Sequence, residues 1–143
     1  MKYLFRLFAF AVVALAISGC NEAPVPMNPN WPIVIDNSLQ NKIKITNSIS
    51  RERKDGLAEV QFGVKNRLSE TNLDFLYHVQ WYDKEGFNIK SITDTFVPIH
   101  LGPSEEKVLS VIATSPKVVT YKIFIVDYEK NKKRVKNETN QYN

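Results

Sequence analysis

The chain has 143 residues, of which 43% are hydrophobic, and its 19 basic and 15 acidic side chains give a net charge of +4. This length suits one ordinary domain and excludes two well-cored ones, while the apolar content excludes a wholly disordered chain. A single cysteine excludes an intrachain disulfide and a cysteine-rich zinc module, and two histidines leave little from which to build a metal site.

Residues 1–19 are typical of a secretory signal peptide. A basic start with Lys2 and Arg6 precedes eleven uninterrupted apolar residues, Leu7–Ile17. A membrane-spanning helix needs about 20 apolar residues, so this segment is too short to span and has the length of a signal core. We therefore expect a targeting segment that is cleaved before Cys20.

The only cysteine follows Ile17, Ser18 and Gly19. This sequence resembles the lipobox of bacterial lipoproteins, in which the cysteine is acylated and becomes the first residue of the mature protein. Each buried methylene contributes about 0.8 kcal/mol, so an anchor with three acyl chains would hold durably. The resemblance predicts lipid attachment at Cys20, and an ordinary signal peptide that happens to contain a cysteine is the alternative.

The residue after the cysteine bears on the membrane. In bacteria with two membranes, an aspartate at this position retains such lipoproteins in the inner membrane, and Asn21 stands there instead. For such a host we expect the outer membrane, with the domain facing the periplasm.

Residues 20–32 combine the anchor with a proline-rich tether, because four of the seven prolines lie between Asn21 and Pro32. Proline fixes φ and removes a backbone donor, so neither a helix nor a strand ladder can run through this stretch. A polyproline-like spacer rises about 3.1 Å per residue, so twelve residues could reach about 35 Å. We expect a stalk that lifts the domain off the membrane.

Residues 33–128 are predicted to form the folded domain, because apolar side chains recur there at every second position, as in half-buried strands. Ala58–Lys65 and Leu73–Tyr82 alternate most clearly. Val108–Ala113 and Val118–Val126 supply two later runs, and the last one carries apolar residues on both faces.

A weaker run places Ile43, Ile45 and Ile49 on one face, with Lys44 and Thr46 on the other. Turn signals separate the runs at Arg51–Gly56, Asp83–Gly86, Leu101–Ser104 and Ser115–Lys117. No stretch of ten residues after the signal has convincing helical spacing. The pattern predicts an all-β domain, an antiparallel immunoglobulin-like β-sandwich of about seven short strands, with a small barrel as the alternative.

The central segment resembles the YcfL-like family of small bacterial envelope lipoproteins. The resemblance covers roughly residues 40–127 and rests on Gly56–Asn66, Leu73–Gly86, a strand at Phe96–Leu101, the turn Gly102–Lys107 and the break Ala113–Pro116. Its most specific piece is Trp81-Tyr82-Asp83 with Gly86 three residues later. The resemblance implies a periplasmic, lipidated, immunoglobulin-like domain and brings no established catalytic residues.

The residues that could carry chemistry are few. Trp81 alternates in phase with the apolar residues of its strand, so we expect it in the core, whereas Tyr82 has outward parity and is a candidate surface contact. We expect His78 and His100 to be surface histidines rather than ligands or bases.

Glu105 and Glu106 are neighbours on an extended chain and so cannot act as a carboxylate pair. The sequence contains no nucleophile elbow, phosphate-binding glycine loop, HExxH sequence or calcium loop. We therefore expect no enzyme, no cofactor and no metal.

Residues 129–143 form a basic polar tail that we expect to be flexible. Its cations are Lys130, Lys132, Lys133, Arg134 and Lys136. An exported protein rarely meets nucleic acid, so anionic headgroups, envelope phosphates or an acidic partner are the better ligands. A solvated, frayed end without a ligand is the simpler interpretation.

Together these features favour a non-enzymatic, membrane-anchored lipoprotein that presents its domain to another envelope protein, as an accessory to an envelope machine. The alternative is binding of an anionic envelope polymer or lipid surface through the tail and the exposed aromatic residues. A purely structural spacer is a third, weaker hypothesis, and the oligomeric state stays open.

Overall fold

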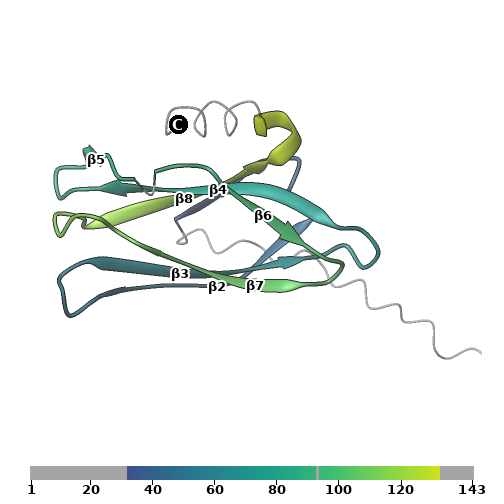
Figure 1. Ribbon diagram of the computed structural model, residues 1–143, viewed down its shortest axis with the longest axis horizontal. Coiled ribbons are helices and arrows are strands. Elements are labelled where there is room, and N and C mark those ends of the chain that lie inside the picture. The colour runs from purple at the N-terminus through teal and green to yellow at the C-terminus, as the bar shows by residue number, and fades with distance from the viewer. Residues whose placement is uncertain (1–31, 93, 133–143) are drawn as a thin grey trace, which may run out of the picture.

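The structure is a computed structural model that describes residues 32–92 and 94–132 (Figure 1). It contains eight strands: β1 (Ile33–Ile35), β2 (Ile43–Glu52), β3 (Ala58–Asn66), β4 (Leu73–Tyr82), β5 (Asn88–Ile89), β6 (Val97–Leu101), β7 (Glu106–Ile112) and β8 (Thr120–Asp127). The count is one more than the predicted seven, and it includes two very short strands, β1 with three residues and β5 with two.

The strands form two sheets that pack face to face (Figure 1). One is a five-stranded sheet in the order β1-β8-β4-β5, with β6 paired to another part of β4, and the other is a three-stranded sheet in the order β2-β3-β7. No strand pairing within residues 32–92 and 94–132 joins the two sheets. The predicted β-sandwich is therefore confirmed, and the barrel alternative is wrong.

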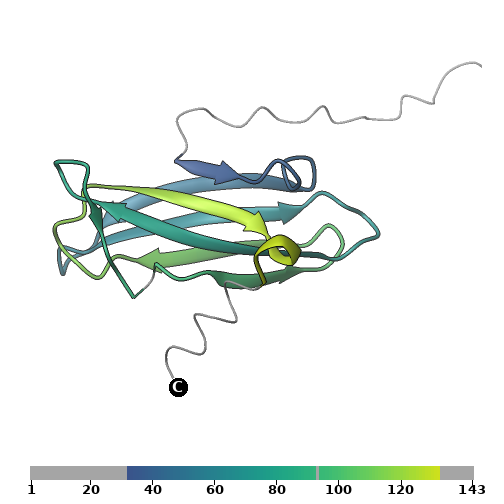
Figure 2. The same cartoon turned by 90° about the horizontal axis from the view of Figure 1, so that it is seen from above.

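Nearly all strand pairs are antiparallel. The exception is β1, which pairs in parallel with β8 with Ile33 opposite Ile123. The strands of both sheets run along the long axis of the domain, as Figure 2 shows from above. The sheets bury their facing sides, as in aligned sandwich packing.

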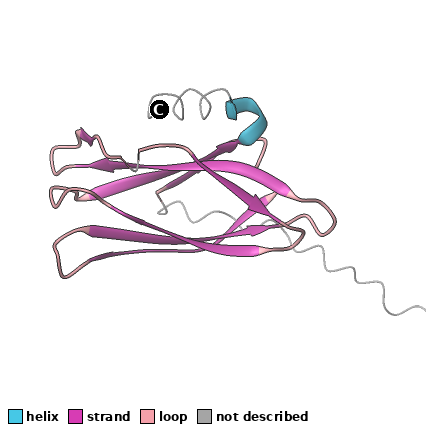
Figure 3. Cartoon of the chain, in the orientation of Figure 1, coloured by secondary structure: helices cyan, strands magenta, loops and turns pink. Residues whose placement is uncertain are grey.

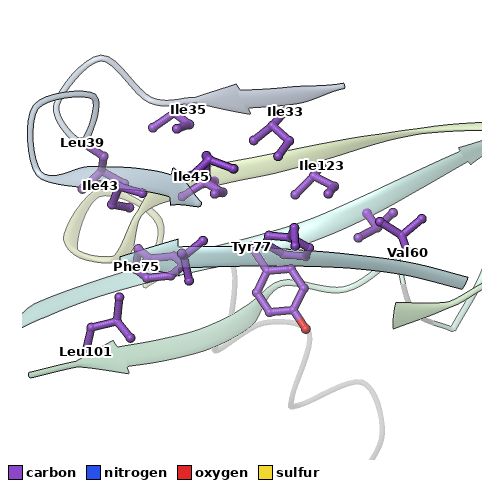
Figure 4. Packing of buried hydrophobic residues seen from close by; sticks show 14 of the residues in the cluster. Ile33, Ile35, Leu39, Ile43, Ile45, Val60, Phe75, Tyr77, Leu101 and Ile123 are labelled. Carbon is purple, nitrogen blue, oxygen red and sulfur yellow. The ribbon is translucent and has the colours of Figure 1, made fainter. Parts of the chain in front are cut away.

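The core lies between the sheets and follows from the alternation in the sequence. Phe62 of β3 and Tyr77 of β4 meet edge to face, with ring centroids 5.4 Å apart. Burying each such side chain contributes about 1.5–3 kcal/mol. Figure 4 shows the packing of core residues that include Ile33, Ile35, Leu39, Ile43, Ile45, Val60, Phe75, Tyr77, Leu101 and Ile123.

The predicted start of the last strand is wrong by two residues. Alternation places Val119 on the same face as Ile123 and Ile125, but its side chain is 69% exposed and β8 begins at Thr120. The reason is the preceding turn, in which the Val118 N–H bonds to the Ser115 carbonyl at 3.4 Å. The chain reaches the sandwich only after this turn.

A single helical turn at residues 128–132 follows β8 (Figure 3). The Asp127 carboxylate caps it by accepting the N–H groups of Glu129 at 3.0 Å and Lys130 at 3.3 Å. Within the part of the chain that the structure describes, no helix has both the length and the apolar character that crossing a membrane requires.

Candidate functional site

The outer face of the three-stranded sheet presents a regular grid of side chains. Strand β3 buries Val60, Phe62 and Val64, so the alternate residues of this central strand point outward. The pairing registers set three outward rows across β2, β3 and β7: Arg51, Glu59 and Ile112; Ile49, Gln61 and Ser110; Asn47, Gly63 and Val108. We call these nine residues the outer face.

Three large apolar residues of the outer face are exposed. Ile49 is 58% exposed, Val108 53% and Ile112 36%. Ile49 lies on β2, and Val108 and Ile112 lie on β7, so the central strand β3 separates them. Single exposed apolar residues are ordinary, but a group on one sheet face is a feature of interaction surfaces.

The exposure of Ile49 overturns the sequence interpretation of β2. The register shifts between Ile45 and Asn47, which leaves Thr46 without a partner residue on β3, as in a β-bulge. One extra residue reverses the phase of the alternation, so Ile49 turns outward and Ser48 turns inward opposite Phe62. Ile43 and Ile45 precede the bulge and stay buried as predicted.

The bulge leaves a polar atom inside. The hydroxyl oxygen of Ser48 is buried and has no hydrogen-bond partner among the described residues. Burying such a group costs about 1–3 kcal/mol. The local structure therefore places an isoleucine outside and an unpartnered serine hydroxyl inside.

Glycine is required where the bulge crosses β3. A Cβ atom on Gly63 would overlap the Thr46 hydroxyl oxygen and lie 3.1 Å from the Asn47 amide oxygen. The Thr46 hydroxyl in turn donates to the Glu106 carboxylate on β7 at 2.6 Å. The bulge is thus held across the whole width of the sheet.

An ion pair marks the other end of the outer face. The Arg51 guanidinium lies 2.7 Å from the Glu59 carboxylate, and the Ser110 hydroxyl donates to the same carboxylate at 3.1 Å. The Arg51 hydrogen bond lowers the pKa of Glu59, the Ser110 bond and the arginine charge add to this effect, and partial burial opposes it. The pair forms a polar rim and contributes little to stability.

A hollow of about 280 Å³ lies beside this pair, lined by Ile49, Ser50, Arg51, Glu59 and Gln61. Small-molecule pockets usually have volumes of about 300–1,000 Å³, so the hollow lies at the lower end of that range. It has an apolar wall at Ile49 and a charged wall at Arg51 and Glu59. The hollow has room for a single side chain of a partner.

The opposite face, on the five-stranded sheet, is partly covered by the chain itself. The His78 ring stacks on Phe124 with centroids 4.9 Å apart and lies 4.5 Å from the Phe96 ring. Its Nδ1 atom is 3.2 Å from the Asp94 carboxylate, and its side chain is only 11% exposed. His78 therefore has the outward parity that the sequence predicts, but the segment before β6 shields it.

The remaining titratable groups among the described residues do not gather into a reactive centre. His100 pairs with Asp74 at 2.7 Å on the exposed β4–β6 edge. Glu105 accepts the Gly102 N–H at 2.6 Å, whereas Glu106 bonds to Thr46. Residues 32–92 and 94–132 contain no group of three histidine, cysteine, aspartate or glutamate side chains that could hold a metal ion.

The residues predicted to carry the family signature shape the fold. Trp81 is fully buried, with its ring centroid 6.1 Å from that of Tyr121. Asp83 accepts the N–H groups of Glu85 and Phe87 at 3.0 and 2.8 Å, and Gly86 has a φ of 87°, which favours glycine. These bonds close the turn from β4 to β5.

The residues predicted from the sequence to be surface contacts do not lie together in the structure. Tyr82 is half-buried and donates to the Gln80 side chain at 2.8 Å. Lys130 lies 3.5 Å from Asp36 and Lys132 lies 2.6 Å from Glu129, and the Glu129 hydrogen bond raises the pKa of Lys132. The other predicted sites lie outside the described residues: Ile17, Ser18, Gly19, Cys20, Lys133, Arg134 and Lys136.

Comparison with known families finds one family to which the domain is similar. A family model described as a protein of unknown function, DUF1425, matches residues 32–127. The chain belongs to the DUF1425 family. The YcfL-like resemblance is compatible with DUF1425 membership, and the YcfL-like name itself stays a prediction. No curated protein matches the chain significantly.

Two solved structures resemble the domain. Campylobacter jejuni cj0090 is 16% identical with a TM-score of 0.58, and the match covers 67% of this chain and 97% of that one. A DUF1425 family member from Shewanella sp. pv-4 is 10% identical with a TM-score of 0.52, covering 58% of this chain and 75% of that one. At these identities the likeness shows the fold alone.

Proposed function

We propose that the protein is a non-enzymatic envelope lipoprotein whose outer face binds another protein of the bacterial envelope. The observation that carries the proposal is the bulge at Thr46, which exposes Ile49 and buries the unpartnered Ser48 hydroxyl. Departures from local folding rules are expected where function demands them. A bulge that costs stability and exposes an apolar side chain is such a departure.

The composition of the outer face supports a protein partner. Protein interfaces combine an apolar centre with a polar rim. Ile49, Val108 and Ile112 would supply the apolar contacts, and the Arg51–Glu59 pair would lie at the rim.

The predicted anchor completes the proposal. Lipid attachment at Cys20 would hold the domain at a membrane, in the outer membrane of a host with two membranes, and the tether of residues 20–32 would give it reach. The anionic-polymer alternative would rest on the tail, of which the structure describes Lys130 and Lys132, each close to a carboxylate.

The test is recovery of a partner from cells of the native host. The full chain, with Cys20 intact, is crosslinked in vivo as wild type, as Ile49→Asp and as the control Val119→Asp. Val119 is an apolar residue that is even more exposed than Ile49 and lies just before β8, outside the outer face. A charge at an apolar interface contact costs about 1–3 kcal/mol, so we expect roughly a five-fold or greater loss of the partner for Ile49→Asp alone. Equal recovery from both variants, or no specific partner of the wild type, would contradict the proposal.

A further inference from the structure

We propose that the β7 edges of two copies of this chain pair antiparallel about Ser110 and join their three-stranded sheets into one continuous sheet. This inference goes beyond the proposed function, because the occupant of the edge is a second copy and not the envelope partner. Three observations support it: β7 is the least protected edge strand among those described, its free backbone groups can be assigned, and its side chains pair with those of a second copy.

Among the described strands, β7 is the edge least protected against pairing. It pairs with β3 alone, and Val108–Ile112 contains no proline, bulge or charged residue. The edge strand β6 carries Pro98, which lacks an N–H, and β2 is interrupted by the bulge at Thr46. Strands β1 and β5 are too short to offer a long ladder.

The free backbone groups of β7 can be assigned. The Ala113 N–H bonds to the Ala58 carbonyl at 2.8 Å, and the Asn66 N–H bonds to the Glu105 carbonyl at 2.8 Å. Hydrogen-bonded residues alternate along an antiparallel strand, so the backbone N–H and C=O groups of the odd-numbered residues of β7 point toward β3. The N–H and C=O groups of the even-numbered residues, Val108, Ser110 and Ile112, therefore point away from the sheet.

A second copy with Ser110 opposite Ser110 matches this phase. Val108 then faces Ile112 of the second copy, and each of these pairs exchanges both of its backbone hydrogen bonds. On the buried side, Leu109 lies opposite Val111. Apolar pairs thus form on both faces of the joined sheet, each contributing about 0.2–1 kcal/mol.

Charge placement favours this register over those centred on Leu109 or Val108, in which Lys107 and Glu106 would lie opposite residues of the apolar stretch Val108–Ile112. Pairing about Ser110 sets Lys107 opposite the neutral Ala113, whereas pairing about Val108 would set Lys107 against Leu109 and Glu106 against Ser110. A one-residue slip would oppose inward and outward faces. Lys107 is also held at its own end of the edge, because it donates to the His100 carbonyl at 2.7 Å and lies 3.4 Å from Glu105.

The pairing is isologous, since the same edge serves both copies about a two-fold axis. It brings Val108 of one copy beside Ile112 of the other. The two outer faces then form a single surface, and the envelope partner would meet apolar residues from both copies.

Disulfide trapping tests the pairing in the full chain. Residues of a hydrogen-bonded antiparallel pair have Cα atoms about 5.5 Å apart, within the disulfide range, so Ser110→Cys is expected to form about ten-fold more oxidised dimer in membranes than Gln61→Cys. Gln61 lies in the same row of the outer face, but on the central strand. Adding Val108→Lys to Ser110→Cys is expected to reduce the dimer several-fold while circular dichroism stays unchanged.

Equal yields from Ser110→Cys and Gln61→Cys, or a yield that Val108→Lys does not change, would overturn the pairing. The result is independent of the partner experiment. Ile49 lies outside β7, so Ile49→Asp is expected to lose the envelope partner and to keep the Ser110→Cys dimer.

Discussion

Thr46 of β2 donates a 2.6 Å hydrogen bond to the Glu106 carboxylate of β7, across the intervening strand β3. The two residues can meet because Gly63 lies between them without a side chain. The contact holds the bulge that reverses the phase of β2. The outward phase of β2 beyond the bulge, including the exposure of Ile49, depends on this register shift.

We expect Gly63→Ala to destabilise the domain by about 1–3 kcal/mol, because the new methyl group overlaps the Thr46 hydroxyl and forces it aside. Urea denaturation measures the loss. In the double variant Gly63→Ala with Thr46→Ala the obstacle is gone, so the two changes are expected to be less than additive. Strict additivity would show that the hydroxyl does not limit the space above Gly63.

Much of the sandwich could be predicted from the sequence, because apolar residues at every second position of β3 and β4 form their core faces, although Leu76 is also fully buried in the opposite phase of β4. Trp81 lies where its phase within β4 places it. The bulge could not be predicted, since a register shift depends on the pairing of β2 with β3, and β2 itself contains no glycine or proline. The pairing of His78 with Asp94 likewise joins residues 16 positions apart through a turn that alternation does not describe.

We expect Ser48→Ala to stabilise the domain by about 1 kcal/mol, because it removes a buried hydroxyl that has no partner among the described residues. Ser50→Ala is the control, since Ser50 has the same inward phase on β2 but is exposed. Thermal unfolding of the two variants makes the comparison. A loss of stability in Ser48→Ala would mean that the hydroxyl is bonded in solution.

The pH dependence of stability is expected to report on Asp36. The Ser38 N–H, at 3.0 Å, lowers the pKa of this carboxyl below 3.8, and the Ser38 hydroxyl and Lys130 add to the effect, against partial burial. Because the folded-state pKa is the lower one, the contribution is present above about pH 3.8 and lost as the pH falls through the folded-state value. The Asp36→Asn variant should melt at most a few degrees below wild type at pH 7.

This difference in melting temperature should shrink as the pH falls below about 3.8, where the unfolded chain takes up the proton, and should vanish below the lower folded-state pKa of Asp36. Melting curves recorded from pH 7 to pH 2.5 follow it. A difference that stays constant over this range would mean that the charge of Asp36 makes no contribution.

Replacing Cys20 tests the predicted anchor. Cys20→Ala removes the thiol to which the lipid would attach, so we expect the chain to leave the membrane fraction and to migrate differently on denaturing gels. Ser18→Ala, a small-for-small change at a lipobox position, is the matched control and should keep the membrane location. Unchanged mobility and location of the Cys20→Ala chain would contradict lipidation.

Site-specific photocrosslinking tests the central claim, binding at the outer face, most directly. A photoreactive residue is placed at Gln61, in the middle of the outer face, or at the control Gln40, which is exposed in the turn between β1 and β2. Each full chain is irradiated in living cells of the native host. The account predicts a discrete crosslinked protein from position 61 that is absent from position 40. The same products from both positions, or none from position 61, would contradict binding at the outer face.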